Sequence, residues 1–92
     1  MAWWRRIYGH KPAASLDGME YRVACKLHSQ NGEREVEVLM FRNGDAYLLE
    51  RQRAASGAFE DRHSGRLVGP FPSPGDAERF IVTTDWFNGR DG

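Results

Sequence analysis

The chain has 92 residues, of which 40% are hydrophobic and 28% charged, with 13 basic and 13 acidic side chains. This length suits one domain with a single modest core, and the composition is typical of a soluble globular protein rather than a disordered or membrane-spanning one. The formal net charge of zero disfavours a role on nucleic acid, because proteins that bind phosphate backbones usually carry a basic excess.

Residues 1–18 are expected to form an aromatic, basic segment followed by a linker. The linker, residues 9–18, combines Gly, Pro, Ser and Asp without periodicity. No apolar run long enough for a secretory leader follows the first basic residues. The segment's notable side chains are Trp3, Trp4, Arg5, Arg6, Ile7 and Tyr8.

The single cysteine, Cys25, excludes an internal disulfide and with it an extracellular disulfide scaffold. A reducing compartment fits this composition best. We therefore expect a cytoplasmic protein with no membrane-spanning segment.

Two Asn-Gly dipeptides, Asn31-Gly32 and Asn43-Gly44, lie one strand-length apart between stretches in which apolar and polar residues alternate. Asn and Gly tolerate the positive φ that a two-residue type I′ turn requires, so we expect a tight turn at each. The chain from about residue 19 is therefore predicted to begin with a three-stranded antiparallel meander.

Counting outward from Asn31-Gly32 predicts the register of the first hairpin. Lys26 then lies opposite Glu37 and His28 opposite Glu35, which are pairs of favourable sign on one face. The opposite face pairs Leu27 with Val36, Cys25 with Val38, Val23 with Met40 and Tyr21 with Arg42.

The second hairpin allows two registers. A two-residue loop puts Val38 opposite Leu49, whereas a three-residue loop ending at Asp45 turns Leu48 inward. We favour the first, although it sets Glu37 against Glu50, because it extends the face that is already apolar. It also pairs Met40 with Tyr47 and Arg42 with Asp45. The predicted core face is Tyr21, Val23, Cys25, Leu27, Val36, Val38, Met40, Tyr47 and Leu49.

Residues 54–71 are predicted to hold a turn-rich loop and then a short strand. Phe59 is the only large apolar residue of the loop, residues 54–65, so at most a weak strand is expected there. Residues 66–71 form the fourth strand, which ends among prolines that cannot donate to a ladder.

A C-terminal helix is predicted from Ser73 to a stop at Asn88-Gly89. Ser73 is placed to cap the helix, Pro74 fits its first turn, and Asp76 meets the positive end of its dipole. The apolar stripe is Ala77, Phe80, Ile81, Thr84 and Phe87. The fold is thus predicted to be α+β, a three- to four-stranded antiparallel meander with one C-terminal helix on one face, in a single domain of residues 19–89.

No catalytic, cofactor or metal site is predicted. The histidines His10, His28 and His63 have no neighbours at ligand spacing, and Cys25 alternates with core residues. The run from Glu60 to Ser64 contains hydrolase residue types without the spacing of a catalytic site. We expect a protein without enzymatic activity.

Apolar side chains left over after the core is built predict a contact surface for a partner protein or for self-association. The alternative, that the N-terminal segment folds back over one of these patches, stays open. The candidate contact residues are Trp3, Trp4, Val82, Trp86, Leu39 and Phe41.

Nucleic-acid binding is the alternative function. Arginine outnumbers lysine by eleven to two, and arginine suits phosphate contacts, although acidic residues are interleaved. The candidate residues are Arg5, Arg6, Arg22, Arg42, Arg51 and Arg53.

The stretch Gly65–Ser73, followed by Asp76–Phe80, resembles the ending of a family of short bacterial proteins known chiefly as a domain of unknown function. That resemblance covers about a quarter of the chain and implies a strand that closes on Gly-Pro-Phe and leads into a capped helix. The sheet-plus-helix pattern is also similar to DNA-binding modules of the plant AP2 type and of phage integrase arms, which implies a sheet that reads the major groove.

Overall fold

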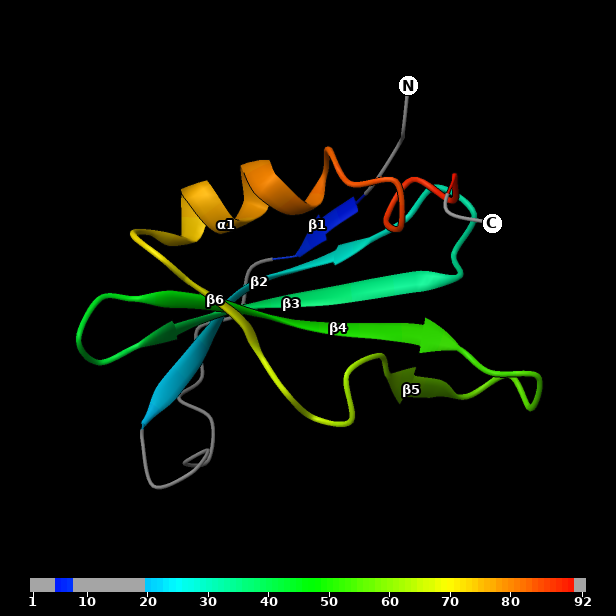
Figure 1. Ribbon diagram of the computed structural model, residues 1–92, viewed down its shortest axis with the longest axis horizontal. Helices are drawn as coiled ribbons and strands as arrows, with labels where there is room; N and C mark the ends of the chain where they lie inside the picture. Colours follow the sequence, from blue (N-terminus) through cyan, green and yellow to red (C-terminus); the bar gives the residue numbers. More distant parts are fainter. Residues whose placement is uncertain (1–4, 8–19, 91–92) are drawn as a thin grey trace.

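The structure is a computed structural model that describes residues 20–90 in full and residues 5–7 by their backbone. One antiparallel sheet is formed in the order β1-β2-β3-β4-β5, and β6 also pairs with β4 (Figure 1). The strands are β1 (Arg5–Ile7), β2 (Tyr21–His28), β3 (Arg34–Phe41), β4 (Ala46–Arg53), β5 (Phe59–Asp61) and β6 (Val68–Phe71), and helix α1 spans Pro74–Ile81. The predicted α+β class, a meander with one C-terminal helix, is confirmed.

The N-terminal segment contributes a strand to the sheet. β1 pairs antiparallel with β2, with Arg5 opposite His28 and Ile7 opposite Lys26. The backbone of residues 5–7 thus extends the sheet at the edge of β2, while the expected cover over an apolar patch falls on side chains outside the described residues.

The first hairpin has the predicted register near its turn but not along its whole length. Leu27 lies opposite Val36 and Cys25 opposite Val38, as predicted. Ala24 is then an extra residue on β2, a bulge that places Val23 opposite Leu39 and shifts the rest of the strand by one position. The predicted pairs Val23–Met40 and Tyr21–Arg42 are therefore wrong, because alternation alone does not reveal a bulge.

The predicted type I′ turns are also wrong. Among the described residues only Ser64 combines positive φ with a side chain, so neither Asn31 nor Asn43 adopts the left-handed conformation. Each Asn side chain accepts a backbone hydrogen bond instead, from Glu33 N–H at 2.9 Å and from Asp45 N–H at 3.0 Å. These asparagines stabilise their loops through their side chains.

The second hairpin uses the three-residue loop, so the favoured register is wrong by one residue. Phe41 N–H donates to the carbonyl of Asp45 at 2.8 Å, and Gly44, at φ 95°, donates to the carbonyl of Phe41 at 2.9 Å. A loop that closes on a left-handed glycine is a common hairpin connection. Val38 consequently lies opposite Leu48, and Glu37 lies opposite Leu49 rather than Glu50.

Strand β4 carries two short strands on its outer edge. β5 pairs with Arg51–Arg53, and β6 pairs with β4 through Ala46 opposite Phe71 and Leu48 opposite Val68. Both strands fall where residues 54–71 were expected to form a weak strand and a short one. Gly69 permits the close approach of β6, because a Cβ there would lie 2.8 Å from the Tyr47 ring.

Helix α1 begins as predicted but ends early. The Ser73 hydroxyl accepts the Asp76 backbone N–H at 3.2 Å and donates to the Asp76 carboxylate at 2.9 Å. The helix stops at Ile81, and residues 82–89 continue as turns, so the predicted helix as far as Asn88 is wrong. The Thr83 and Thr84 hydroxyls donate to carbonyls three residues back, which is a local alternative to helix hydrogen bonding.

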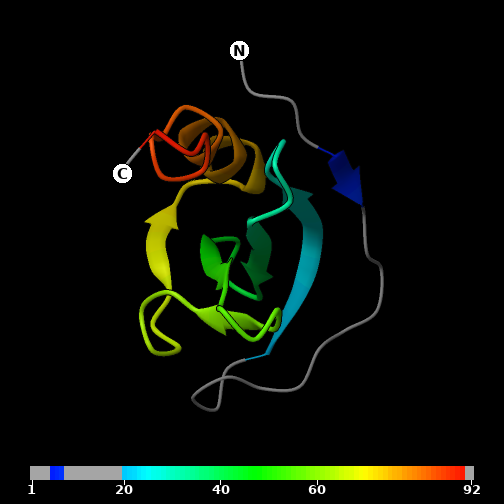
Figure 2. The same ribbon diagram turned by 90° about the vertical axis from the view of Figure 1, so that its right-hand side faces the viewer.

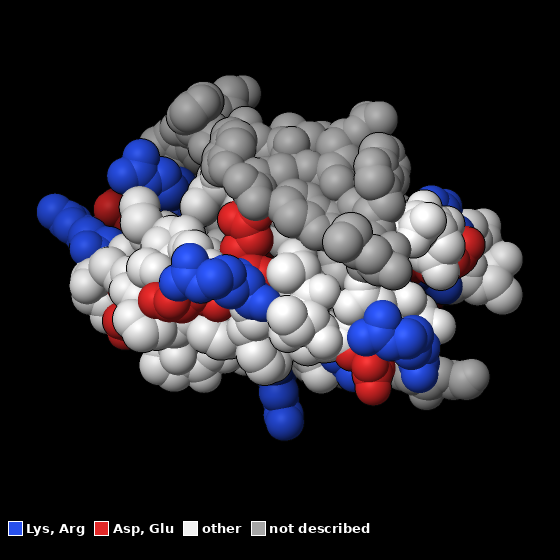
Figure 3. Space-filling model, turned by 90° about the horizontal axis from the view of Figure 1, so that it is seen from above, with Lys and Arg blue, Asp and Glu red and all other residues white. Residues whose placement is uncertain are grey.

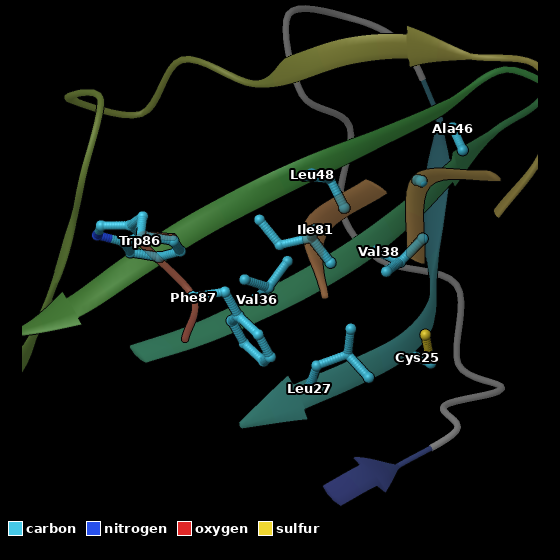
Figure 4. Close-up of a cluster of buried hydrophobic side chains, with 10 residues drawn as sticks. Cys25, Leu27, Val36, Val38, Ala46, Leu48, Ile81, Trp86 and Phe87 are labelled. Carbon is cyan, nitrogen blue, oxygen red and sulfur yellow. The ribbon is translucent and has the colours of Figure 1, made fainter. Parts of the chain in front are cut away.

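The core lies between the sheet and the α1 segment, and Figure 2 shows the sheet curving around it. Trp86 and Phe87 lie at one end of the cluster, and Cys25 and Ala46 at the other (Figure 4). Its buried members are Cys25, Leu27, Val36, Val38, Ala46, Leu48, Ala77, Ile81, Trp86 and Phe87.

Several predicted core positions lie elsewhere. The bulge and the longer loop turn Tyr21, Val23, Tyr47 and Leu49 to the opposite face of the sheet. Phe80, predicted on the buried stripe of the helix, is 44% exposed. Phe87 is buried as predicted, but because α1 ends early it reaches the core from a turn rather than from the helix.

No helix within residues 20–90 is long and apolar enough to cross a membrane.

Candidate functional site

Trp86 lies across the end of the core, over a pair of directly opposite residues on β3 and β4. Arg34 and Gln52 form that pair. The Trp86 indole N–H donates to Gln52 Oε1 at 3.1 Å, and Arg34 Nη1 donates to the Trp86 carbonyl at 2.7 Å. The guanidinium carbons of Arg34 and Arg62 lie 5.2 Å and 4.4 Å from the centre of an indole ring. Only 4% of Trp86 is exposed. Trp86 and the side chains that contact it therefore close this end of the core.

Glu50 is a buried carboxylate on the same face as the core. It alternates with Ala46 and Leu48 along β4 and is 3% exposed. Its Oε1 accepts Arg62 Nη1 at 2.6 Å and lies 3.0 Å from His63 Nε2, while its backbone carbonyl accepts Arg62 N–H at 2.8 Å. The charge is therefore paired, as a buried carboxylate requires. The arrangement attaches the loop between β5 and β6 to the sheet.

The opposite face of the sheet carries a row of charges that crosses four strands. His28, Glu35, Arg51 and Asp61 are directly opposite one another from β2 to β5. Arg51 contacts Glu35 and Asp61, each at 3.1 Å, and also reaches Glu37 at 3.3 Å. Glu35, Arg51 and Asp61 alternate in sign along the row, which stabilises the pairing of β3, β4 and β5.

The charges around Arg51 affect its ionisation. Burial by itself lowers the pKa of the guanidinium, but Glu37 and hydrogen bonds to Glu35 and Asp61 outweigh burial and raise this pKa above its ordinary value. The predicted pairs Lys26–Glu37 and His28–Glu35 are confirmed by the register, with separations of 3.7 Å and 4.0 Å.

An aromatic pair lies where β6 meets α1, with one ring exposed to solvent and the other packed against the core. Phe80 and half-buried Phe71 have ring centroids 5.3 Å apart at an interplanar angle of 41°. Within residues 20–90, Phe80 is the only large hydrophobic side chain classed as exposed. Pro70 and Pro72, on either side of Phe71, are exposed as well. We refer to Phe71 and Phe80 as the Phe71–Phe80 pair.

The structure buries most of the residues predicted to be exposed contact points. Trp86 is 4% exposed, Leu39 0% and Phe41 5%, so the expectation that these side chains are free on the surface is wrong. Val82 is half-buried and packs against the core. The physical reasons are the early end of α1, which redirects Trp86, and the aromatic contacts of Phe41 with Tyr21 and Tyr47 at 5.4 Å and 5.0 Å. Trp3 and Trp4 lie outside the described residues.

The arginines proposed for nucleic acid do not form one patch. Arg22 is opposite Met40, near the loop that contains Arg42, whereas Arg51 and Arg53 lie at the far end of β4. Arg5 and Arg6 are in β1, and their side chains are outside the description.

Three of the four arginines whose side chains are described, Arg42, Arg51 and Arg53, also have carboxylate neighbours. Arg42 lies 3.6 Å from Glu20, and Arg53 lies 3.7 Å from Glu33 with its guanidinium over the ring of Phe59. Basic and acidic atoms accordingly lie side by side in the view of Figure 3. Such pairing reduces the positive potential that a phosphate backbone would meet.

The residues considered for metal or redox chemistry remain dispersed. Cys25 is buried in the core, as predicted, and is 2% exposed. No group of three His, Cys, Asp or Glu residues in the described part of the chain could hold a metal ion. His28 and His63 each lie beside one carboxylate, on opposite faces of the sheet.

Sequence reasoning missed the residues around Trp86 and Glu50. Glu50 falls in the alternation of Ala46 and Leu48, so the three-residue loop would have placed it inward. The preference for the two-residue loop, which sets Glu50 opposite Glu37 on the outer face, hid that signal. The contacts of Arg34 and Arg62 with Trp86 join residues far apart in the chain and have no local pattern.

Comparison with known proteins identifies no family for this chain. No protein-family model, curated protein or solved structure matches the chain.

Proposed function

We propose that this chain is a small non-catalytic cytoplasmic domain that binds a protein, either another chain or a second copy of itself, through the Phe71–Phe80 pair. One observation carries the proposal: the large exposed hydrophobic side chain within residues 20–90 is Phe80, on an otherwise charged helix surface. Aromatic residues are enriched at the centres of protein contact sites.

The position of the pair favours contact with a partner. Ala77 and Ile81 already bury the inner side of α1, so Phe80 contributes little to the core. The Phe80 ring contacts the Phe71 ring and therefore has a defined orientation before a partner binds. A ring held in place loses less conformational freedom on association.

The charged clusters support a non-catalytic role. Arg62 and His63 both use their side chains on the Glu50 carboxylate, and Arg51 is surrounded by three carboxylates. These contacts give Arg62, His63 and Arg51 a structural role in holding the sheet and its loop together. The cytoplasmic location rests on the single cysteine, which the fold buries.

Self-association is the first form of the proposal to test. Sedimentation velocity over a wide concentration range would compare the native chain with Phe80→Ser and with Thr83→Ser, an exposed change three residues further along. We expect a concentration-dependent oligomer that Phe80→Ser abolishes and Thr83→Ser retains. A native chain that stays monomeric throughout removes self-association.

A different partner is tested by a photo-crosslinking side chain placed at position 80 or, as the matched control, at position 83, in cells that express the chain. Position 80 should give a discrete protein adduct that position 83 does not. Equal labelling at both positions would contradict the proposal.

Nucleic-acid binding is the competing proposal and has its own outcome. Binding to duplex DNA at low salt that weakens steeply toward physiological salt, and that Arg22→Ala or Arg53→Ala reduces, would favour it over protein binding. The carboxylates beside Arg42, Arg51 and Arg53 lead us to expect no such binding.

A further inference from the structure

The chain contains three Asn-Gly dipeptides, at Asn31, Asn43 and Asn88. An asparagine followed by glycine is especially prone to deamidation, since glycine has no side chain to hinder attack by its backbone nitrogen on the preceding amide. We propose that Asn43 is a site of spontaneous modification in the folded protein, and that the fold protects Asn88 most strongly and Asn31 to a lesser degree.

The reaction needs only water and the groups of the dipeptide. The Gly44 backbone nitrogen loses its proton and forms a bond to Cγ of Asn43, while the bond from Cγ to Nδ2 breaks and ammonia leaves. Water then opens the resulting cyclic imide at either of its two carbonyl carbons. The products are aspartate, or isoaspartate with the main chain running through the side-chain carbon, and no electrons are transferred.

Asn43 is the least restrained of the three asparagines. Both Asn43 and Gly44 are exposed, and no atom beyond Gly44 and its two chain neighbours lies within 4 Å of the position that a Cβ of Gly44 would occupy. The side-chain hydrogen bonds of Asn43 both go to Asp45, at 3.0 Å and 3.3 Å, and both are exposed to solvent. Water can replace them at little cost when the side chain rotates toward Gly44.

Asn88 is held by the interior of the C-terminal turns. It is half-buried, and its Nδ2 donates to the carbonyls of Val82 at 3.0 Å and Thr84 at 2.8 Å. Both bonds must break before the amide can be attacked. Two net hydrogen bonds correspond to roughly a ten- to hundredfold change in an equilibrium constant.

Asn31 is intermediate. Its Oδ1 accepts the Ser29 hydroxyl at 2.7 Å and Glu33 N–H at 2.9 Å, and a Cβ at Gly89 would lie 3.3 Å from its Nδ2. The side chain is therefore bonded at one end and confined at the other.

The attacking nitrogen does not distinguish the three sites. The N–H groups of Gly44, Gly32 and Gly89 donate to backbone carbonyls at 2.9, 3.0 and 3.2 Å. Each must be released before attack, so the side-chain restraints decide the order of reaction.

The outcome differs between sites as well. At Asn43 the product adds one negative charge to an exposed loop of a chain whose formal net charge is zero, so the folded protein persists as a more acidic species. At Asn88 the new carboxylate would face two carbonyl oxygens where the amide had donated to both. Modification there would unfold the C-terminal turns.

The test is to incubate the full chain under native, mildly alkaline conditions and in denaturant, and to follow each asparagine by peptide mapping with mass spectrometry. In the native protein we expect modification at Asn43 to be at least about tenfold faster than at Asn88, and this ratio to fall to about one in denaturant, where the hydrogen bonds are absent. Isoelectric focusing should show a single acidic species accumulating first.

The control is Asn43→Asp, which keeps an oxygen to accept the Asp45 N–H and already has the product's charge. It should lack the early acidic step. Modification of Asn31 or Asn88 ahead of Asn43, an Asn43 to Asn88 ratio that denaturant leaves unchanged, or no product at Asn43 while the denatured chain reacts, would each overturn the proposal.

Discussion

At the scale of single residues, Trp86 shows how the same side chain can suggest a surface in the sequence and belong to the core in the structure. Arg34 donates to its carbonyl, Gln52 accepts its indole N–H, and Arg62 lies over its ring. An aromatic residue with so many specific contacts is expected to contribute to folding rather than to binding.

Replacement of Trp86 by alanine should therefore lower the free energy of unfolding by about 3 to 5 kcal/mol, the usual cost of removing a large buried aromatic side chain. Trp86→Phe keeps a ring but loses the hydrogen bond to Gln52, and it should cost less, about 1 to 2 kcal/mol. Urea denaturation followed by circular dichroism measures both. Native-like stability of the alanine variant would show that Trp86 lies on the surface after all.

Glu50 makes the second prediction at this scale. Glu50→Gln should reduce stability by about 1 to 3 kcal/mol, because Arg62 and His63 lose the carboxylate that they share. The matched control is Glu60→Gln on exposed β5, which should change stability by less than about 0.5 kcal/mol. Equal effects of the two substitutions in the same urea titration would argue against the proposed attachment of the loop.

At the scale of elements, the start of α1 has a titratable cap. Hydrogen bonds from Ser73 and from Arg79 to the carboxylate lower the pKa of Asp76 below its ordinary value of 3.8. A carboxylate whose pKa is lowered by folding stabilises the protein above its unfolded-state pKa, and this contribution is lost as the pH falls through the folded-state value.

Asp76→Asn should accordingly be less stable than the native chain near neutral pH, and the difference should vanish in strong acid. Thermal melts of both proteins from roughly pH 7 to about pH 2 would measure the difference. Ser73→Ala, which removes a hydrogen bond of the same cap, should reduce the pH dependence as well. A gap between native and Asp76→Asn proteins that is constant across this range would contradict the assignment.

At the scale of the whole molecule, the N-terminal segment is joined to the sheet through β1. Deletion of residues 1–7 should lower the free energy of unfolding by roughly 1 to 2 kcal/mol relative to deletion of residues 1–4, which leaves β1 in place, because the second truncation keeps the backbone pairing with β2. Guanidinium unfolding of both truncated chains gives the comparison. Identical midpoints would mean that β1 contributes nothing to stability.

Much of the architecture could be predicted because it follows from local chemistry. The alternation in residues 21–53, the loops at Asn31 and Asn43, and the Ser73 cap each depend on a few adjacent residues. The strand closing at Phe71 and leading into α1 also follows from the local pattern. Membership of the bacterial family that shares this ending stays a prediction.

The remaining features depend on contacts between distant residues or on small differences between alternatives. An Asn-Gly pair suits both a two-residue loop and the observed three-residue loop, and a change of one residue reverses which face Leu48 and Tyr47 occupy. Alternation does not reveal the bulge at Ala24, and α1 ends at Ile81 where the Thr83 and Thr84 hydroxyls donate to carbonyls of the preceding turn. The errors in register and in the end of α1 also made the predicted contact residues wrong, because register and helix length determine which aromatic rings are exposed.

Strand β4 has a consequence for how the domain opens. It is paired along one edge by β3 and along the other by β6 and β5, while its inward residues Ala46, Leu48 and Glu50 are buried. Each backbone N–H of β4 faces one of these two edges, so it exchanges with deuterated solvent only when the strand on that side separates, and separation from β3 also divides the core and amounts to global unfolding. The slowest-exchanging amides of this protein are expected in β4, and those of α1, which has an open outer side, should exchange sooner through local opening.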